Sequence, residues 1–342
     1  MENEKSFIAL LEKSIKKNWD ADSLTDYKGV TYQYKDVARK IEKLHIIFEE
    51  SGVKPGDKIA VCGRNMSHWG VTFLATVTYG AVIVPILHEF KPDQVHNIVN
   101  HSEAKLLFVG DVVWEGLDES AMPNLEGVIL VNDFSLLVSR TEKLTYAREH
   151  LNELFGKKFP KNFRKEHINY YKDSQNELLV LNYTSGTTGS SKGVMLCERN
   201  VCAVLEGIYP FLAGLTKEDS VMSVLPIYHT YEMSAGILAP MLYGMTISIS
   251  DGIKYVGKNI KQFKPTVMAL VPLFAIVHVG GVNMNEYRDR SLRGRVFQQI
   301  RENILSGKYK DGMELREIIL GEELGVKVQD ELDKIAGNKF RD

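Results

Sequence analysis

The sequence predicts an α/β protein with two doubly wound, mostly parallel sheets. Short apolar runs bounded by turn residues alternate with segments of helical spacing, which is typical of parallel strands joined by right-handed helical crossovers. This alternation occurs twice, before and after a highly charged stretch at residues 141–177. A chain of 342 residues is also long enough to bury two lobes of this kind. We therefore expect two subdomains, at approximately 1–195 and 196–342.

The first series of elements begins with a helix. Apolar residues recur every three or four positions from Val37 to Phe48 and stop before Gly52, as on the buried face of an amphipathic helix. The turn pair Pro55-Gly56 then introduces the first strand. This strand and two others are predicted at 58–62, 81–85 and 105–109, with helices between them at 69–77 and 95–99.

The second series follows the charged stretch. An apolar run at 180–183 is expected to end the preceding series as a strand. Beyond residue 195, the predicted strands lie at 220–225, 246–250, 266–271 and 315–320, and the predicted helices at 232–242, 255–263 and 292–305. Sheets of this type bind ligands at the carboxyl ends of their strands, so we expect a ligand cleft there. The charged stretch 141–177 is interpreted as a solvated excursion between the halves. Its basic core at 157–165, which contains phenylalanines, would also suit nucleic acid or a lipid surface.

The composition argues against nucleic acid as a partner. The chain has 42 basic and 44 acidic residues, a formal net charge of −2, so an anionic ligand must be held locally. The three cysteines lack metal-ligand spacing, which fits buried thiols in a reducing compartment. The N-terminus lacks the pattern of a signal peptide, and the longest uncharged run, 71–87, is too short to span a bilayer comfortably. We therefore expect a cytoplasmic protein without a transmembrane segment.

One loop carries most of the functional information. Residues 182–195 read NYTSGTTGSSKGVM, and glycines, hydroxyl groups and one lysine in a short loop are suited to holding phosphate oxygens. The loop follows an apolar run, and a helix is predicted from Val194, so we place it where a strand leads into a helix. It is not a Walker loop, because Lys192 is followed by Gly193 instead of a hydroxyl residue, and it lacks the G-x-G-x-x-G of dinucleotide-binding proteins. A flexible surface linker would leave the lysine unexplained.

The loop resembles the signature of the AMP-forming acyl-CoA synthetases, which belong to the adenylate-forming superfamily. Residues 183–194 match [YT]-T-S-G-T-T-G-x-P-K-G-V except at Ser191, where the family usually has proline. We expect this difference to loosen the loop without removing a phosphate donor. The element PIYHTYE at 226–232 is similar to that of fatty-acid-activating members. Other stretches that resemble the family in the same order lie at 29–32, 52–57, 80–85, 264–267 and 271–274.

The resemblance implies ATP-dependent activation of a fatty acid. The acid's carboxylate attacks the α-phosphate of ATP, pyrophosphate leaves, and coenzyme A then takes the acyl group. The acid is already ionised at neutral pH, so the first step needs charge neutralisation and alignment and no general base. The resemblance thus implies ATP, Mg2+ and coenzyme A as cofactors, and His229 and Lys192 as catalytic residues.

The resemblance also assigns residues to each part of the site. Those expected at the phosphates are Thr184, Ser185, Gly186, Thr187, Thr188, Gly189 and Lys192, with Thr184 also a candidate near magnesium. Those expected at the acyl chain are Tyr228, His229, Tyr231 and Val271. By periodicity alone, Tyr231 and Val271 fit the hydrophobic core equally well.

Two departures from the family pattern leave the activity of this chain open. Gly321 is followed by Glu322 where the family has a glycine pair packed on adenine, and a carboxylate there would repel a triphosphate. No Tyr-Gly-x-Thr-Glu element occurs before the chain ends at Asp342, so the family's β-barrel part and C-terminal domain are absent from this sequence. We expect part of a longer acyl-CoA synthetase. The alternatives are a non-catalytic nucleotide- or acyl-binding protein and a P-loop NTPase, and acyl chain length, peripheral membrane contact and homo-oligomerisation stay open.

Overall fold

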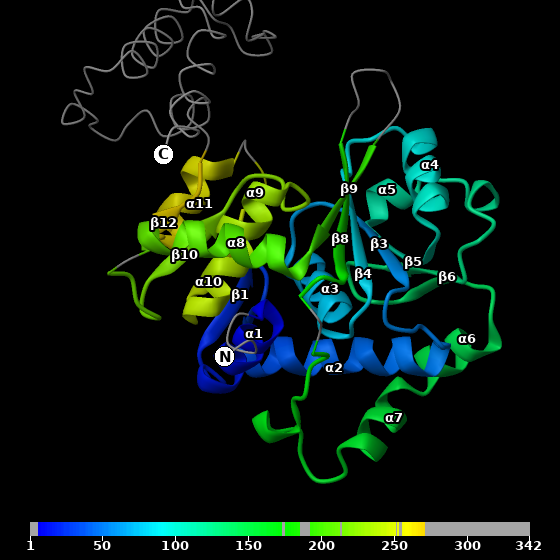
Figure 1. Ribbon diagram of the computed structural model, residues 1–342, viewed down its shortest axis with the longest axis horizontal. Coiled ribbons are helices and arrows are strands. Elements are labelled where there is room, and N and C mark those ends of the chain that lie inside the picture. The colour runs from blue at the N-terminus through cyan, green and yellow to red at the C-terminus, as the bar shows by residue number, and fades with distance from the viewer. Residues whose placement is uncertain are drawn as a thin grey trace, which may run out of the picture. The chain divides into compact units, whose positions relative to one another are not determined.

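The computed structural model describes residues 6–172, 175–184, 192–212, 214–250, 252 and 255–270. The predicted elements at 292–305 and 315–320, and the expectations for Val271, Gly321 and Glu322, lie outside these residues. The described residues form two sheets with helices packed around them (Figure 1). The predicted α/β class with two mostly parallel sheets is therefore confirmed.

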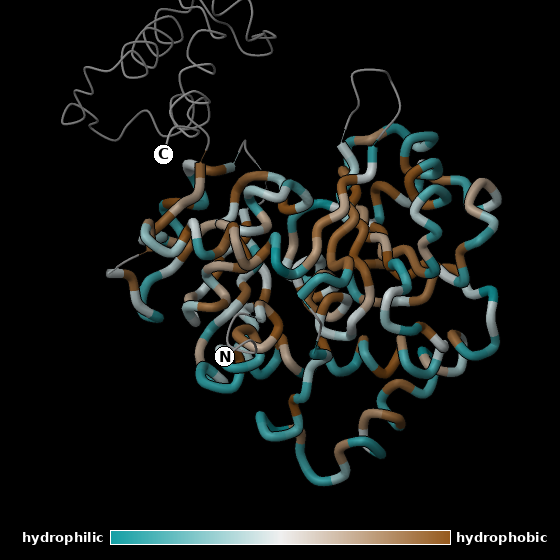
Figure 2. Tube along the Cα trace, in the orientation of Figure 1, coloured by the Kyte–Doolittle hydropathy of each residue, from teal (hydrophilic) through white to brown (hydrophobic). Residues whose placement is uncertain are grey.

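The larger sheet has seven strands in the order β7-β6-β5-β3-β4-β8-β9. The two edge strands, β7 and β9, are antiparallel to their neighbours, and the inner strands are parallel. The inner strands are apolar on both faces, as a sheet covered by helices on both sides requires, and Figure 2 shows apolar residues concentrated along them. The bounds are β3 (Lys58–Cys62), β4 (Val82–Ile86), β5 (Ala104–Val109), β6 (Gly127–Leu130), β7 (Leu136–Ser139), β8 (Leu178–Thr184) and β9 (Lys192–Cys197).

Alternate residues of the strands enter two different cores. Ile59 and Val61 of β3 pack with α2 (Tyr34–Ser51) and α3 (Ser67–Thr78), whereas Ala60 and Cys62 pack in a second cluster with α4 (Pro92–Ser102). This division follows from the two-residue period of a strand. The helix predicted from Val37 is α2, and it ends as predicted at Gly52, whose φ of 85° is left-handed and is adopted by glycine without strain. Two short helical segments, α5 (Asp111–Trp114) and η2 (Glu119–Ala121), follow β5.

The smaller sheet draws its strands from distant parts of the chain. Its order is β12-β10-β11-β1-β2, and β1 lies parallel to β11 with Leu24 opposite Ile247. Residues 22–33 thus belong to the second sheet, so the expected division of the chain at residue 195 does not coincide with the division into sheets. The bounds are β1 (Asp22–Asp26), β2 (Thr31–Gln33), β10 (Ser220–Ser223), β11 (Thr246–Ile249) and β12 (Val267–Met268).

Several helices surround the smaller sheet. A continuous helical run follows β10 and consists of α9 (Thr230–Glu232), the π-helical segment η5 (Met233–Leu238) and α10 (Ala239–Tyr243). It corresponds to the helix predicted at 232–242. α1 (Phe7–Lys17) and α8 (Glu198–Ile208) pack beside this run, and α8 continues into η4 (Tyr209–Leu212). The helix predicted at 255–263 is α11 (Val256–Phe263).

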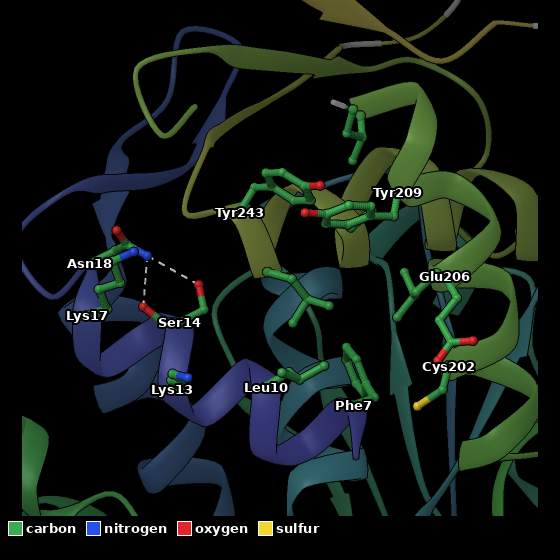
Figure 3. Close-up of a pocket in the computed structure, with 14 residues that line it drawn as sticks. Phe7, Leu10, Lys13, Ser14, Lys17, Asn18, Cys202, Glu206, Tyr209 and Tyr243 are labelled. Carbon is green, nitrogen blue, oxygen red and sulfur yellow. Dashed lines mark hydrogen bonds between the residues drawn. The ribbon is translucent and has the colours of Figure 1, made fainter. Parts of the chain in front are cut away.

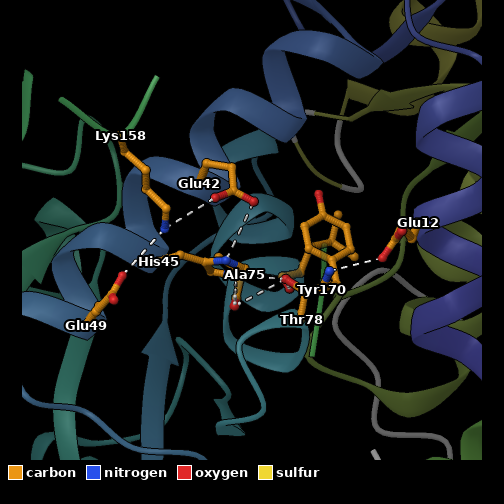
Figure 4. A network of polar contacts seen from close by, with 9 residues as sticks. Glu12, Glu42, His45, Glu49, Ala75, Thr78, Lys158 and Tyr170 are labelled. Carbon is orange, nitrogen blue, oxygen red and sulfur yellow. Dashed lines mark hydrogen bonds and ion pairs between the residues drawn. The ribbon is translucent and has the colours of Figure 1, made fainter. Parts of the chain in front are cut away.

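The charged stretch 141–177 was predicted to be a solvated excursion. In the structure, part of it packs against α2 and the core around the larger sheet. α6 (Glu142–Glu149) buries Leu144 and Ala147, and α7 (Leu151–Lys158) and the short helix η3 (Lys165–His167) follow. Figure 4 shows Lys158 between two glutamates of α2, with its Nζ 3.9 Å from Oε2 of Glu42 and 3.5 Å from Oε2 of Glu49. The backbone N–H of Tyr170 donates to Glu12 Oε2 of α1 over 3.0 Å.

Replacing Lys158 with methionine is expected to destabilise the fold in a pH-dependent way. Burial raises the pKa of Glu42 to about 7, so its carboxylate is mostly neutral at pH 5.5 and charged at pH 8.5. Lys158 is 41% exposed, so solvent weakens the pair, and we expect a loss of about 1 kcal/mol or less at pH 8.5 and a smaller loss at pH 5.5. Urea unfolding at both pH values measures this. Lys157→Met is the control, because Lys157 pairs only with the exposed Glu153 among the described residues. An equal loss at both pH values would contradict the role of Glu42.

Candidate active site

Thr184 and Lys192 lie opposite each other at the base of the loop 185–191. β8 and β9 are antiparallel neighbours, and their register pairs Thr184 with Lys192. Directly opposed residues in such a pair have Cβ atoms about 4.5–5.5 Å apart. Both residues are exposed. A hydroxyl and an ammonium group therefore meet at one place, and both can donate hydrogen bonds to phosphate oxygens.

The prediction that this loop leads from a strand into a helix is wrong. The residues after the loop form β9, and α8 begins only at Glu198. Pairing with β8 continues through Val194 and Leu196, so tertiary pairing outweighs the local helical spacing of this segment. A Walker loop joins a strand to a helix, so the hairpin differs from that class in topology as well as in spacing. The predicted phosphate contacts of Ser185, Gly186, Thr187, Thr188 and Gly189 lie outside the described residues.

Tyr183 anchors the strand that enters the loop. Its ring is buried at 4% exposure, and its hydroxyl lies 2.6 Å from Nδ1 of His101 on α4. Burial raises the pKa of Tyr183, so the hydroxyl stays protonated, and it donates to Nδ1 in the tautomer whose imidazole proton is on Nε2. On the neighbouring strand, a Cβ added at Gly193 would lie 3.4 Å from the Tyr183 ring. His101 was not predicted as a site residue, because it comes from a helix distant in sequence.

Replacing Tyr183 with phenylalanine is expected to lower the free energy of unfolding by about 1 kcal/mol, because the hydrogen bond to His101 is lost within a packed cluster. Tyr146→Phe is the matched control, since the Tyr146 ring is 44% exposed. Urea unfolding of the two variants measures the difference. If Tyr183→Phe is as stable as the control, the hydrogen bond does not hold the strand.

Asn65 joins the carboxyl ends of the two sheets. It lies just after β3 of the larger sheet, and its side chain bridges the segment that follows β10 of the smaller sheet. Nδ2 of Asn65 donates to the carbonyl oxygen of Leu225 over 2.7 Å, and the backbone N–H of Ile227 donates to Oδ1 over 3.1 Å. Two hydrogen bonds of Asn65 thus connect the strand ends of the two sheets. The only indication of this role in the sequence was an amide residue shortly after a buried strand.

The predicted acyl-side residues Tyr228, His229 and Tyr231 come directly after the segment that Asn65 binds. His229 caps the N-terminus of α9, and its Nδ1 accepts from the backbone N–H of Tyr231 over 3.2 Å. With Nδ1 occupied as an acceptor, the neutral ring carries its proton on Nε2. The Tyr228 ring lies 6.3 Å from the His229 ring and is half-buried, whereas Tyr231 is 44% exposed. Burial, and then the charge of Glu89, raises the pKa of Tyr228.

Charged residues from the larger sheet face the same region. Arg64 follows β3, and His88 and Glu89 follow β4. Burial lowers the pKa of His88, Glu89 opposes this effect, and Arg64 adds to it. The charge of Glu89 thus affects the pKa of both His88, which follows β4, and Tyr228, which follows β10. These groups were missed by sequence reasoning, which treated this stretch as the end of a buried strand.

A buried carboxylate holds the start of the α9–η5–α10 run against β10. Glu232 is fully buried, and its Oε1 accepts from the Ser223 hydroxyl over 2.6 Å and from the Val224 backbone N–H over 3.1 Å. A Cβ at Gly236 would lie 2.3 Å from the same oxygen, so glycine leaves the room that this carboxylate occupies. π-Helical segments such as η5 frequently occur at functional sites. Glu232 therefore fixes the helix that presents His229.

Within the described ranges, no three histidine, cysteine or acidic residues are grouped so that they could hold a metal ion. No helix in the part of the chain that the structure describes has both the length and the apolarity needed to cross a membrane. The Thr184 hydroxyl fits a magnesium-bound phosphate by its place beside Lys192, and its contact with magnesium stays a prediction.

Sequence comparisons identify the family of this chain and several relatives. The AMP-binding enzyme family matches residues 11–341. Long-chain-fatty-acid–CoA ligase 5 of Rattus norvegicus is 28% identical over 261 residues, which cover 72% of this chain and 37% of that protein. The peroxisomal long chain acyl-CoA synthetase 6 of Arabidopsis thaliana is 28% identical over 275 residues, which cover 75% and 36%. The chain thus spans little more than a third of the length of these relatives.

Solved structures share the fold. An anthranilate CoA ligase in complex with anthranoyl-AMP superposes with a TM-score of 0.65 at 19% identity, over 79% of this chain and 49% of that one. A long-chain-fatty-acid–CoA ligase from Archaeoglobus fulgidus superposes with a TM-score of 0.64 at 19% identity, over 82% and 54%. The match of the family model over residues 11–341 shows that this chain belongs to the AMP-binding enzyme family.

Proposed function

We propose that this chain forms the nucleotide- and acid-binding part of an AMP-forming acid–thiol ligase that activates fatty acids. The observation that carries the proposal is the pairing of Thr184 with Lys192 across a hairpin whose loop has the family's signature. The curated relatives with the names given above are long-chain acyl-CoA ligases, which supports a fatty acid as the substrate. ATP and coenzyme A are the other substrates of the proposed reaction.

In the proposed first step, the chain brings two anions together. The fatty acid carboxylate attacks the α-phosphorus of ATP, the bond to the bridging oxygen breaks, and pyrophosphate leaves with that electron pair. Lys192 and Thr184 lower the repulsion by donating to the phosphate oxygens. Magnesium, when bound, supplies further neutralisation of phosphate charge, and Thr184 is the residue that we assign to it. Coenzyme A then displaces AMP from the acyl-adenylate.

The acid is assigned to the residues at the start of α9. The exposed His229 lies beside Tyr228 at the start of α9, and its Nε2–H can donate to a carboxylate or acyl oxygen. We assign these two residues to the acyl head, in keeping with the fatty-acid type of the element at 226–232. Tyr231 is assigned to the entrance of the acyl site, because it is exposed.

The test is exchange of labelled pyrophosphate into ATP by the 342-residue protein, with magnesium and fatty acids from short to long. This half-reaction needs no thiol and reports only the adenylation step. Exchange that depends on both the acid and magnesium would support the proposal, and the preferred acid would give the chain length. A folded protein that binds ATP without exchange would instead support a non-catalytic nucleotide-binding role. ATP hydrolysis to ADP without an acid would contradict membership of the reaction class.

A further inference from the structure

A pocket lies between α1, α8 with η4, and the end of α10 (Figure 3), and none of the predicted phosphate or acyl residues lines it. Its volume is about 590 Å³, within the roughly 300–1,000 Å³ typical of small-molecule sites. Its walls are mainly apolar and are formed by Phe7, Leu10, Leu205, Leu212, Ala239 and Leu242. The size and lining suit an apolar molecule or an apolar chain.

The pocket is distinct from the proposed ATP and acyl sites. His229 precedes the α9–η5–α10 run, whereas Leu242 and Tyr243, which line the pocket, lie at its end. Leu242 lies thirteen positions after His229 along this helical run, which corresponds to about 20 Å at the usual helical rise. α1 also lines the pocket but supplies none of the predicted phosphate or acyl residues.

The rim of the pocket carries charge on opposite sides. Lys13 and Lys17 lie one helical turn apart on α1, line the pocket and are exposed. Neither has an ion-pair partner among the described residues, in contrast to Lys16, which pairs with Glu12. The opposite wall, α8, carries Glu206. An anionic group is therefore attracted to the α1 side of the rim.

Aromatic hydroxyl groups add a polar patch within the apolar walls. The rings of Tyr209 and Tyr243 are 5.8 Å apart, and Figure 3 shows their hydroxyl groups turned toward each other in the pocket. An amphipathic ligand could place a polar atom against them. A polyphosphate would instead need several cationic and backbone donors close together, and the lining offers two lysines on one helix.

We propose that this pocket binds a single-chain amphipathic carboxylate, that is, a free fatty acid, with its chain among the apolar walls and its carboxylate at Lys13 and Lys17. Apolar walls provide most of the binding surface, and the two lysines select a ligand with a carboxylate and fix its orientation in the pocket. Binding requires neither ATP nor magnesium, so the proposal does not depend on the adenylation reaction. The pocket would bind the free fatty acid whether or not the acid is being converted to its adenylate.

Cys202 gives a direct readout, because its thiol lies in the wall of the pocket and is half-buried. Burial raises the pKa of Cys202 to about 11, so its alkylation by a maleimide at pH 8.5 is slow enough to follow. Cys197 is also half-buried, does not line the pocket and serves as the reference within the same molecule. Alkylation of each thiol is followed by mass spectrometry with rising palmitate, below its aggregation concentration and without ATP.

We expect saturating palmitate to slow the alkylation of Cys202 about tenfold and to leave that of Cys197 unchanged. In the double variant Lys13→Met with Lys17→Met, the palmitate concentration for half-protection should rise about tenfold, the effect of one lost charge-assisted hydrogen bond. Lys16→Met, on the same helix but outside the lining, should behave like the unmodified protein. 1-Hexadecanol, which lacks the carboxylate, should protect the unmodified protein and the double variant equally.

Three results would overturn the proposal. Equal protection of both cysteines by palmitate would indicate a general effect on the fold. An unchanged palmitate concentration for half-protection after removal of the lysines would show that the carboxylate does not lie at Lys13 and Lys17. Resistance of Cys202 to alkylation in the folded protein before any ligand is added would show that the chain itself closes the pocket. In the Lys192→Ala variant, palmitate is expected to protect Cys202 as it does in the unmodified protein. Failure of adenylation and failure of this site can therefore be distinguished.

Discussion

Replacing Lys192 with alanine is expected to lower acid-dependent exchange of pyrophosphate into ATP about 100-fold, the usual loss when a preorganised donor to a developing anion is removed. Lys192 begins β9 and lies opposite Thr184, at the base of the loop that carries the family's signature. Pyrophosphate leaves with additional negative charge, so a cation here stabilises the transition state more than the bound reactants. The residue is exposed, so its truncation should leave the free energy of unfolding nearly unchanged.

Two controls separate the role of this charge from general electrostatics. Lys217→Ala removes an equally exposed lysine from the turn before β10, where it pairs with Glu218, and should leave exchange unchanged. Lys192→Arg keeps the positive charge with a different shape and should retain more exchange than Lys192→Ala. Equal exchange by the alanine variant and the unmodified protein would remove Lys192 from the mechanism. A parallel loss of stability would instead indicate a structural role.

The parts of the fold that local pattern could predict are those with a single strong period. β3, β4 and β5 were found from short apolar runs after turn residues, and the end of α2 from Gly52, because these signals lie within one element. The pairing of β1 with β11 joins residues more than 200 positions apart, and no local period encodes it. The segment from Val194 was predicted as a helix for the same reason: a short apolar run fits either a helix or a strand until its partner strand is known.

The candidate site shows the same division. Thr184 and Lys192 were predicted because a phosphate loop has a characteristic composition, which is visible in the sequence. His101 and Asn65 were not, because each acts through a hydrogen bond to a segment distant in sequence. Glu232 stood within a recognised element and still had no predicted role. Its importance comes from complete burial, which the sequence does not reveal.

The burial of Glu232 leads to the second large effect, on stability. Burial raises the pKa of Glu232 from 4.5 to about 7, while hydrogen bonds from Ser223 and Val224 oppose this shift. The folded protein therefore binds this proton more tightly than the unfolded chain does. The stabilisation from this proton is fully present below about pH 4.5 and is lost as the pH rises to about 7. Above that pH, this group causes no further change in stability. A shift of this size corresponds to roughly 3 kcal/mol.

Glu232→Gln should remove this pH dependence. Glutamine keeps a carbonyl oxygen that can accept from Ser223 and Val224 and stays neutral at every pH. Near pH 5, where the glutamate is mostly protonated in the folded protein, the two proteins should be similarly stable. At pH 8 the variant should be more stable than the unmodified protein by about 3 kcal/mol. Urea unfolding at several pH values between 5 and 8 measures the difference.

The comparison with the unmodified protein isolates this one group. Glu42, whose pKa is also raised to about 7, titrates in both proteins and cancels from the difference. Glu218→Gln is the matched control, because Glu218 is 79% exposed and should give a difference that does not change with pH. Glu232→Ala should be destabilised at every pH, since it leaves the Val224 N–H and the Ser223 hydroxyl without their acceptor. A constant difference for Glu232→Gln would mean that the folded protein holds this carboxylate at its ordinary pKa. Its hold on β10 would then depend on the hydrogen bonds from Ser223 and Val224 alone.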